Sequence, residues 1–256
     1  MTTDHKVSAR QIDWEEYARC YDFLLHLNPY TSLLDKVASA ALSMKPESIL
    51  DAACGTGNLA VFLKRHCESR MPDISCVDAS AAMLSAAKRK YSDLPAEFAQ
   101  ASLDDPLPFR DKSFDCIVSV NTLYAVRSPD QTLSEFSRVL KPGGMVVLST
   151  PRQGNENGLI LREHCCSKKP SAYWADMHSD PEREAVLIRE AMPDPRLHKE
   201  ALRVAEWNRI INDDASFHFP NEHMAKTLLE KAGFTVTIMS LAYAKQNLFA
   251  VAVRNQ

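Results

Sequence analysis

Glycines and an acid early in the chain have the spacing of a site for a nucleotide-like ligand. An apolar strand is predicted to end near Asp51, and the bend Cys54-Gly55-Thr56-Gly57 then leads into a helix. Glycine lets the backbone turn sharply and lets a ligand come close, and a helix N-terminus attracts polar groups. We therefore expect Asp51 to point at the ligand rather than into the core. The spacing also fits Gly-x-Gly-x-x-Ala, a dinucleotide fingerprint, so the bend alone leaves the ligand open.

A second acid, Asp78, ends the next predicted strand, residues 74–78. A carboxylate in this place can accept both hydroxyls of a ribose, whichever adenosine cofactor carries it. Ser80 is positioned to cap the helix that follows, in which Met83 and Leu84 would share an apolar face. The alternative is that Asp78 is simply an acid in a loop.

Strands and helices are predicted to alternate up to residue 149, which favours a mainly parallel sheet. Ser128 and Gln131 have the spacing of a capping box around Pro129, and that helix would end at Lys141-Pro142-Gly143-Gly144. Further strands are expected at residues 97–102, 116–120 and 145–149.

Four motifs in this order resemble those of the class I S-adenosylmethionine (SAM) methyltransferases. They are Asp51–Gly57, Val77–Leu84, the stretch 107–120 and Arg138–Gly144. The resemblance covers residues 48–150 and is to the small-molecule, ubiquinone-biosynthesis-like type. It implies an α/β fold with a Rossmann-like, seven-stranded, mainly parallel sheet, helices on both faces and a last strand that enters antiparallel. One departure is Ala101-Ser102-Leu103, where the family usually has Gly-Asp-Ala.

The resemblance also implies where SAM would bind. Asp51 and the backbone of the glycine bend would hold the amino-acid end, and Asp78 would hold the ribose. Ser102 and Leu103 would hold adenine, and Asn121 would meet the methionine part through its backbone. The full set of expected cofactor-binding residues is Tyr17, Asp51, Ala53, Gly55, Thr56, Gly57, Asp78, Ala79, Met83, Ser102, Leu103 and Asn121.

Tyrosines and histidines are the candidates on the acceptor side. Tyr124 follows the fourth strand and would face the methyl group, while Tyr17 and Tyr21 lie one helical turn apart and could close the pocket. His178 and His218 lie among aromatic neighbours and are candidate bases. Each tyrosine could instead be a packing aromatic, and each histidine a surface side chain. A base is needed only if the nucleophile begins protonated.

Four segments are predicted along the chain. They are an N-terminal helical cap (1–45), a SAM-binding core (46–152), a helical lid or substrate insertion (153–218), and a C-terminal helix with the last two strands of the core (219–256). The cap would hold two helices broken near Asn28-Pro29. The insertion is too long for a plain loop, and an amphipathic helix is expected from near Pro195. A late helix would run from Pro220 to Gly233 with Met224 turned inward.

The composition limits the partners. The formal charge of −3 gives no electrostatic footprint for nucleic acid or an acidic membrane. No apolar stretch is long enough to span a bilayer, and the first residues, with Asp4, His5 and Lys6, do not resemble a signal peptide. We expect a cytoplasmic monomer or homodimer that acts on a small molecule. Buried, reduced thiols are expected at Cys54, Cys76 and Cys116.

The leading hypothesis is SAM-dependent transfer of a methyl group to an O, N or C atom of a small organic metabolite, by direct in-line displacement. No catalytic metal is expected, because Asn121-Thr122-Leu123-Tyr124 lacks the acids that metal-dependent catechol methyltransferases place there. Three alternatives are a SAM user that transfers another group or closes a ring, an NAD(P)-dependent oxidoreductase, and a SAM-binding sensor. The oxidoreductase fits the glycine bend and Asp78 but not the motifs at 107–144.

Overall fold

A seven-stranded sheet forms the middle of the structure, a computed structural model that describes residues 12–67 and 70–256. The strand order is β3-β2-β1-β4-β5-β7-β6. The N-terminal residues Asp4, His5 and Lys6 lie outside the described residues. The strands are β1 (Ser48–Ala52), β2 (Asp73–Asp78), β3 (Ala96–Gln100), β4 (Phe114–Val120), β5 (Leu140–Pro151), β6 (Phe234–Ala242) and β7 (Asn247–Arg254).

Five neighbouring strands run parallel, and the seventh runs against them. Strands β3, β2, β1, β4 and β5 pair in parallel, β7 pairs antiparallel with β5, and β6 pairs antiparallel with β7. This confirms the predicted seven-stranded, mainly parallel sheet with an antiparallel last strand. Because parallel strands share their direction, the ends of β1, β2 and β4 meet at one edge of the sheet.

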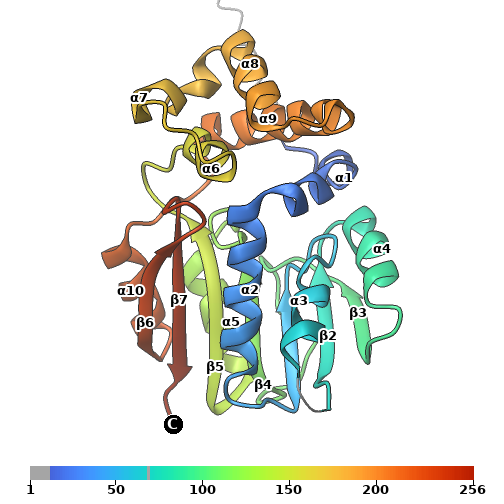
Figure 1. Cartoon of the computed structure of the whole chain (residues 1–256). Helices are drawn as coiled ribbons and strands as arrows, with labels where there is room; N and C mark the ends of the chain where they lie inside the picture. Colours follow the sequence, from blue (N-terminus) through green and yellow to red (C-terminus); the bar gives the residue numbers. More distant parts are fainter. Residues whose placement is uncertain (1–11, 68–69) are drawn as a thin grey trace, which may run out of the picture.

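Helices cover both faces of the sheet (Figure 1). Helices α2, α3 and α4 pack in one apolar cluster, and α5 and α10 pack in a second cluster on the opposite face. Side chains alternate along a strand, so Ile49 of β1 joins the first cluster and Leu50 the second. The helices of this core and of the N-terminus are α1 (Trp14–Tyr17), η1 (Tyr21–His26), α2 (Asn28–Leu42), α3 (Leu59–His66), α4 (Ala81–Lys90), α5 (Pro129–Val139) and α10 (Glu222–Lys231).

Local sequence signals account for most helix starts. The predicted break at Asn28-Pro29 is confirmed, because Leu27 precedes α2 in an extended conformation and proline occupies the first turn. The predicted cap of α4 is also confirmed, since the Ser80 hydroxyl accepts a hydrogen bond from the Met83 amide at 3.1 Å. The first N-terminal helix differs from the prediction: it is a short α-turn followed by the 3-10 helix η1.

Two helix predictions are corrected. Ser128 precedes α5, but its side chain makes no capping hydrogen bond, and its carbonyl accepts from Thr132 instead. The late helix begins at Glu222 rather than Pro220, because Asn221 caps it through the Met224 amide at 2.9 Å. Met224 therefore lies in the first turn and is 49% exposed, not inward.

The segment 153–218 is helical and lies over the carboxyl edge of the sheet together with α1 (Figure 1). The amphipathic helix expected near Pro195 is present as a 3-10 turn followed by α9, whose Val204 and Ile211 are buried. The segment leaves and re-enters the core at neighbouring points, since the Gln153 amide donates to the Pro220 carbonyl at 3.0 Å. Its helices are α6 (Asn157–His164), α7 (Ser171–Trp174), η2 (Met177–Ser179), α8 (Pro181–Ala191), η3 (Pro195–Leu197) and α9 (His198–Asp213).

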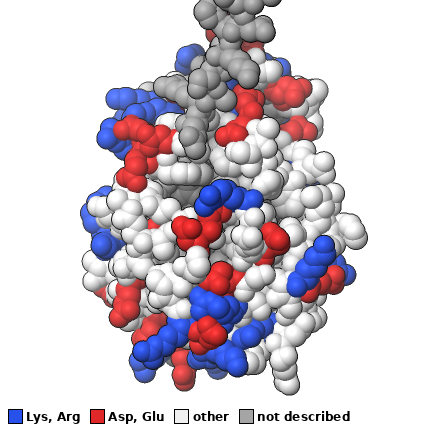
Figure 2. Space-filling view, turned by 180° about the vertical axis from the view of Figure 1, so that it is seen from behind, with Lys and Arg blue, Asp and Glu red and all other residues white. Residues whose placement is uncertain are grey.

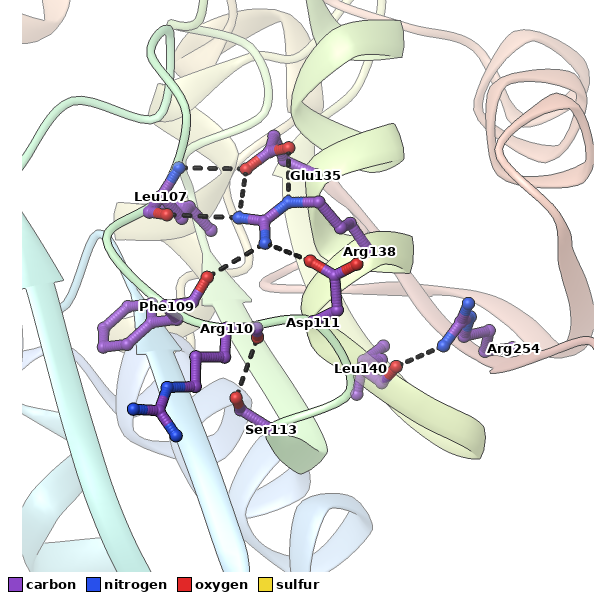
Figure 3. A network of polar contacts seen from close by, with 9 residues as sticks. All are labelled: Leu107, Phe109, Arg110, Asp111, Ser113, Glu135, Arg138, Leu140 and Arg254. Atoms are coloured by element: carbon purple, nitrogen blue, oxygen red, sulfur yellow. Dashed lines mark hydrogen bonds and ion pairs between the residues drawn. The ribbon is translucent and has the colours of Figure 1, made fainter.

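Arg138 fastens the loop between β3 and β4 to α5 (Figure 3). Its guanidinium donates to the backbone carbonyls of Leu107 and Phe109 at 3.1 and 2.9 Å. It also pairs with Glu135 at 2.8 Å and Asp111 at 2.7 Å, and these two carboxylates raise its pKa. Arginine suits this position because its five donors have a fixed planar arrangement. The network holds the loop that follows Leu103.

Surface charges are mixed in sign. On the face opposite to that of Figure 1, the described Lys and Arg side chains are interspersed with Asp and Glu and form no broad area of one sign (Figure 2). Among the described residues, no helix has the length and apolar character needed to cross a membrane. The thiols of Cys54, Cys76 and Cys116 are free and buried, as predicted.

Candidate functional site

The backbone of the glycine bend faces a cavity at Gly55. Ala53, Gly55 and Gly57 all have positive φ angles, of 60°, 54° and 76°. A Cβ atom built on Gly55 would lie 3.7 Å from Cε1 of Tyr21 and 4.0 Å from the sulfur of Met83. Both of these side chains line the cavity, so Gly55 presents bare backbone to whatever occupies it.

Asp78 lines this cavity, and the backbone fixes its carboxylate. One carboxylate oxygen accepts from the Gly55 amide and the other from the Ser80 amide, each at 2.9 Å. Burial raises the pKa of Asp78, while these backbone hydrogen bonds oppose the rise. Each oxygen has a further lone pair, so the carboxylate can still accept two hydroxyl donors.

This cavity, here called the cofactor cavity, brings together nine of the residues expected from the sequence. Eight were expected to bind the cofactor, and Tyr21 was expected on the acceptor side. Residues that sequence reasoning missed include Trp14 of α1 and Asp104. The expected residues that line it are Tyr21, Ala53, Gly55, Asp78, Ala79, Met83, Ser102, Leu103 and Asn121.

The expectation for Asp51 is corrected, because this residue does not line the cofactor cavity. Its carboxylate is only 3% exposed and accepts a hydrogen bond from the Tyr91 hydroxyl at 3.0 Å. The reason is the alternation along β1, which places Asp51 on the same face as Ile49, under α4. Burial raises the pKa of Asp51 to about 7. The carboxyl therefore points into the core, contrary to the expectation.

Thr56 and Gly57 also lie outside the cofactor cavity. The Thr56 hydroxyl donates to Asp22 of η1 at 2.6 Å and so ties the bend to the N-terminal helices. A Cβ on Gly57 would lie 2.9 Å from Cα of Ala87, so this glycine permits close packing of α4 rather than approach of a ligand.

A second cavity adjoins the first and is lined by neutral polar side chains. It shares Trp14, Tyr21 and Asn121 with the cofactor cavity. We call it the Asn/Tyr cavity, because six asparagines and four tyrosines contribute to it. Its described lining is Trp14, Tyr17, Tyr21, Leu24, Asn121, Tyr124, Pro151, Asn155, Asn157, Asn208, Ile211, Asn212, Phe219, Tyr243 and Asn247.

The tyrosines of this cavity are protonated donors. Tyr17 donates to Oδ1 of Asn208 at 3.1 Å, and its ring meets that of Tyr21 edge-on at 5.2 Å. Tyr124 stacks on Phe219 with ring centroids 5.6 Å apart. Burial raises the pKa values of Tyr17, Tyr21 and Tyr124 well above that of a free phenol. At neutral pH these hydroxyls can donate hydrogen bonds but cannot take up a proton as a base.

Asn121 links both cavities to the end of the sheet. It follows β4 with a positive φ of 55°, a conformation that asparagine tolerates better than most residues. Its Oδ1 accepts from Nδ2 of Asn247 at 2.6 Å, and Asn247 is itself held by Ser149 at 2.9 Å. Its backbone amide already donates to the Ser149 carbonyl at 2.7 Å.

The two candidate histidines lie apart from each other. His178 lines a third, largely apolar cavity between the helical segment 153–218 and η1. His218 is exposed: its neighbours Phe217 and Phe219 pack on Tyr124, while its own side chain points outward. Only the backbone of His218 contacts Tyr124: its amide donates to the Tyr124 carbonyl at 2.7 Å. The structure therefore does not bring His218 to the site.

Comparison with known proteins identifies the family. A family profile described as "Methyltransferase domain" matches residues 50–148, which include the glycine bend and Asp78. The ubiquinone/menaquinone biosynthesis C-methyltransferase of Methylococcus capsulatus is 30% identical over 191 residues, which cover 73% of this chain and 67% of that protein. The chain belongs to the class I SAM-dependent methyltransferases. The predicted resemblance is thereby confirmed, and this methyltransferase is an enzyme of the SAM-dependent type.

Other relatives share a smaller part of their length with this methyltransferase. A demethylmenaquinone methyltransferase of Chlorobaculum tepidum is 32% identical over 145 residues, and the chain spans 57% of that relative. Among solved structures, the N-methyltransferase NodS of Bradyrhizobium japonicum, in complex with S-adenosylhomocysteine, superimposes with a TM-score of 0.59 at 12% identity. That likeness covers 96% of this chain and all of the other, and it shows the shared fold.

Proposed function

We propose that this methyltransferase transfers the methyl group of SAM, by direct in-line displacement, to a small uncharged organic acceptor with an acidic phenol, enol or activated carbon. The observation that carries the proposal is the Asn/Tyr cavity, which adjoins the cofactor cavity and whose described lining holds no charged side chain. The two quinone-biosynthesis relatives named above are consistent with this acceptor class.

The cofactor cavity has groups that would suit the adenosine part of SAM. Asp78 would accept the ribose hydroxyls with the lone pairs that Gly55 and Ser80 leave free. Ala101, Ser102 and Leu103 line the cavity where adenine is expected, in spite of their departure from the usual family sequence. Bound SAM supplies a methyl group that its sulfonium already activates. The task of the protein is then to align the acceptor with that methyl group and to exclude water.

Amide groups can stabilise negative charge on the acceptor. Oδ1 of Asn208 accepts from Tyr17 and Oδ1 of Asn121 accepts from Asn247, so the NH₂ groups of both amides are left to donate. Together with protonated tyrosines they form a set of neutral donors. Hydrogen bonds from such donors to a charged oxygen are each worth roughly 1.5–3 kcal/mol.

The absence of a base in the described lining favours an acceptor that ionises by itself. Carboxylate, amine, imidazole and thiol groups do not occur among the described side chains of the Asn/Tyr cavity, and the tyrosines there hold their protons. A phenol or enol can release its proton to solvent water before methyl transfer, whereas an ordinary alcohol needs a base. A fatty acid, the acceptor named for an O-methyltransferase relative from Mycolicibacterium smegmatis, would bring a carboxylate to a cavity without a described cation.

The N-terminal segment 1–45 and the insertion 153–218 would act as the cap and lid of this site. Trp14 and Tyr21 of the N-terminal segment line both cavities, and residues of the insertion, including Asn208 from α9, line the Asn/Tyr cavity. The core segment 46–152 would supply most of the cofactor half, whereas Phe219, Tyr243 and Asn247 of the segment 219–256 line the Asn/Tyr cavity.

Two measurements test the proposal. Calorimetric titration with SAM, S-adenosylhomocysteine and NADH should show binding of the two sulfur ligands only. Assays with labelled SAM should then show methylation of 2-hexyl-1,4-naphthohydroquinone in preference to decanoate and phenethylamine, with product mass raised by one CH₂. Binding of NADH alone would overturn the assignment of SAM as the cofactor. Preferential methylation of decanoate or of the amine would overturn the proposed acceptor class. A product carrying a different group would favour a non-methylating transferase.

A further inference from the structure

An apolar cavity between the helical segment 153–218 and η1 continues from the Asn/Tyr cavity. The two share Leu24, Asn157, Asn208 and Tyr243. The remaining described lining is almost entirely aliphatic or aromatic, and it shares no residue with the cofactor cavity. The three cavities therefore follow one another in a row, with the Asn/Tyr cavity in the middle.

His178 brings one polar atom into this apolar surrounding. Its Nε2 atom is buried, and no described group hydrogen-bonds to it. The other ring nitrogen, Nδ1, contacts a carboxylate oxygen of Glu184. Glu184 is only 2% exposed, and its second oxygen accepts from Nε of Arg209 at 3.2 Å. Helices α8 and α9 thus fix the imidazole ring.

These contacts determine whether Nε2 donates or accepts a hydrogen bond. An ionised carboxylate only accepts hydrogen bonds, so Nδ1 must carry the hydrogen. Arg209 contacts the second oxygen of Glu184. With its hydrogen on Nδ1, the ring presents a lone pair at Nε2. An unpaired buried acceptor of this kind is unfavourable unless a partner supplies a donor.

We propose that the apolar cavity holds an aliphatic arm of the acceptor, and that His178 Nε2 accepts a hydrogen bond from a hydroxyl on that arm. The proposal rests on the proposed function, because the arm belongs to the acceptor whose reactive head occupies the Asn/Tyr cavity. His178 is then a specificity-determining residue rather than a base, since its cavity does not touch the cofactor cavity. Glu184 is a positioning residue that holds the ring in the required tautomer.

Three probes of matched length test the proposal in the unaltered enzyme. They are 1,4-naphthohydroquinones whose 2-substituent is hexyl, 6-hydroxyhexyl or 6-methoxyhexyl, titrated calorimetrically in the presence of S-adenosylhomocysteine. The hydroxyl probe should bind about tenfold more tightly than the other two, because only it offers a donor to Nε2. Equal affinity for the hydroxyl and methoxy probes would overturn the proposal.

Two variants test whether His178 causes the preference for the hydroxyl probe. His178→Leu should remove the preference for the hydroxyl probe, bind the hexyl probe at least as tightly as before and leave the affinity for S-adenosylhomocysteine unchanged. His218→Leu is the matched control, because His218 is an exposed histidine, and it should keep the preference. A preference that persists in His178→Leu would overturn the assignment. If S-adenosylhomocysteine binds but none of the three probes does, the proposed acceptor class fails, and this inference fails with it.

Discussion

The Asp78 carboxylate and the Gly55 amide are joined by a hydrogen bond of 2.9 Å, which ties the end of β2 to the bend that follows β1. Two neighbouring strands thereby share one polar contact at the cofactor cavity. The bond orients the carboxylate before any ligand arrives, so its position does not depend on the cofactor. This preorganisation makes Asp78 the residue whose loss should be most informative.

Asp78→Ala should weaken binding of SAM by more than tenfold. The change removes a charged acceptor for the ribose, worth on the order of 1.5–3 kcal/mol, and also releases the bend at Gly55. Calorimetry with S-adenosylhomocysteine measures the effect. Asp73→Ala, at the exposed start of the same strand, is the control and should bind normally. Unchanged affinity in Asp78→Ala would remove this residue from the site.

Asp51 should make the protein less stable as the pH rises from about 4 to 7. Burial raises the pKa of its carboxyl to about 7, whereas in the unfolded chain the pKa is about 4. The folded state therefore binds the proton more tightly within this window, and folding stability falls as the pH rises through it. Above the window the loss is complete, on the order of 1–4 kcal/mol.

Asp51→Asn tests this dependence, because an amide oxygen can still accept from Tyr91 but does not titrate. Urea unfolding across the window should give a flatter stability profile for the variant than for the unaltered protein. Asp105→Asn, an exposed substitution, should keep the original profile. Identical slopes in all three proteins would show that Asp51 does not cause the dependence.

Gly57→Ala and Gly143→Ala separate backbone strain from packing. Both glycines have a φ of 76°, but a Cβ on Gly143 meets nothing within 4 Å, while one on Gly57 meets Cα of Ala87 at 2.9 Å. Left-handed alanine costs about 1–2 kcal/mol at either position, and overpacking against α4 adds about 1–3 kcal/mol at Gly57 alone. Chemical denaturation measures the difference, and equal losses would mean that α4 moves aside freely.

Arg138→Gln should lower the free energy of unfolding by about 1–3 kcal/mol, because two carbonyls and two carboxylates lose their shared donor. The effect should appear in thermal unfolding and leave the affinity for SAM within a few-fold of normal, since Arg138 does not line the cofactor cavity. Arg110→Gln is a control from the same loop: only its backbone carbonyl takes part in the network of Figure 3. Equal stability of the two variants would contradict the role of Arg138.

Tyr124→Phe should reduce kcat/KM by less than tenfold and leave the shape of the pH–rate profile unchanged. The raised pKa of the hydroxyl keeps it protonated, so its loss removes a donor but no base. The ring can still stack on Phe219. Loss of the basic limb of the profile, together with a fall of several orders of magnitude in kcat, would assign the base role to Tyr124 after all.

The cofactor half of the molecule could be predicted because its signals are local. The glycine bend, Asp78 and the Ser80 cap each lie within a few residues of the strand or helix that positions them. Asp51 was misplaced because its partner, Tyr91, lies 40 residues away, directly after α4. Only the fold shows that the face of β1 with Asp51 meets this tyrosine.

The acceptor side could not be read from the sequence in the same way. Asn157, Asn208 and Asn247 come from α6, α9 and β7, and nothing in their local sequence distinguishes them from surface asparagines. The spacing of Asn208 and Asn212, one helical turn apart beside Ile211, was the available hint of a polar face turned inward. For His218, the aromatic neighbours indicated a place in the site, but in the fold Phe217 and Phe219 pack on Tyr124 while His218 is exposed.

The hydrogen bond between the Gln153 amide and the Pro220 carbonyl has a consequence for how such enzymes diverge. Because the 153–218 segment leaves and returns at adjacent points, its length can change at little entropic cost to the rest of the chain. Mutation, insertion or exchange of this segment would then alter the Asn/Tyr cavity and the apolar cavity, which it lines, while the sheet and Asp78 persist. In such enzymes the choice of acceptor could therefore change during evolution while the use of the cofactor stays the same.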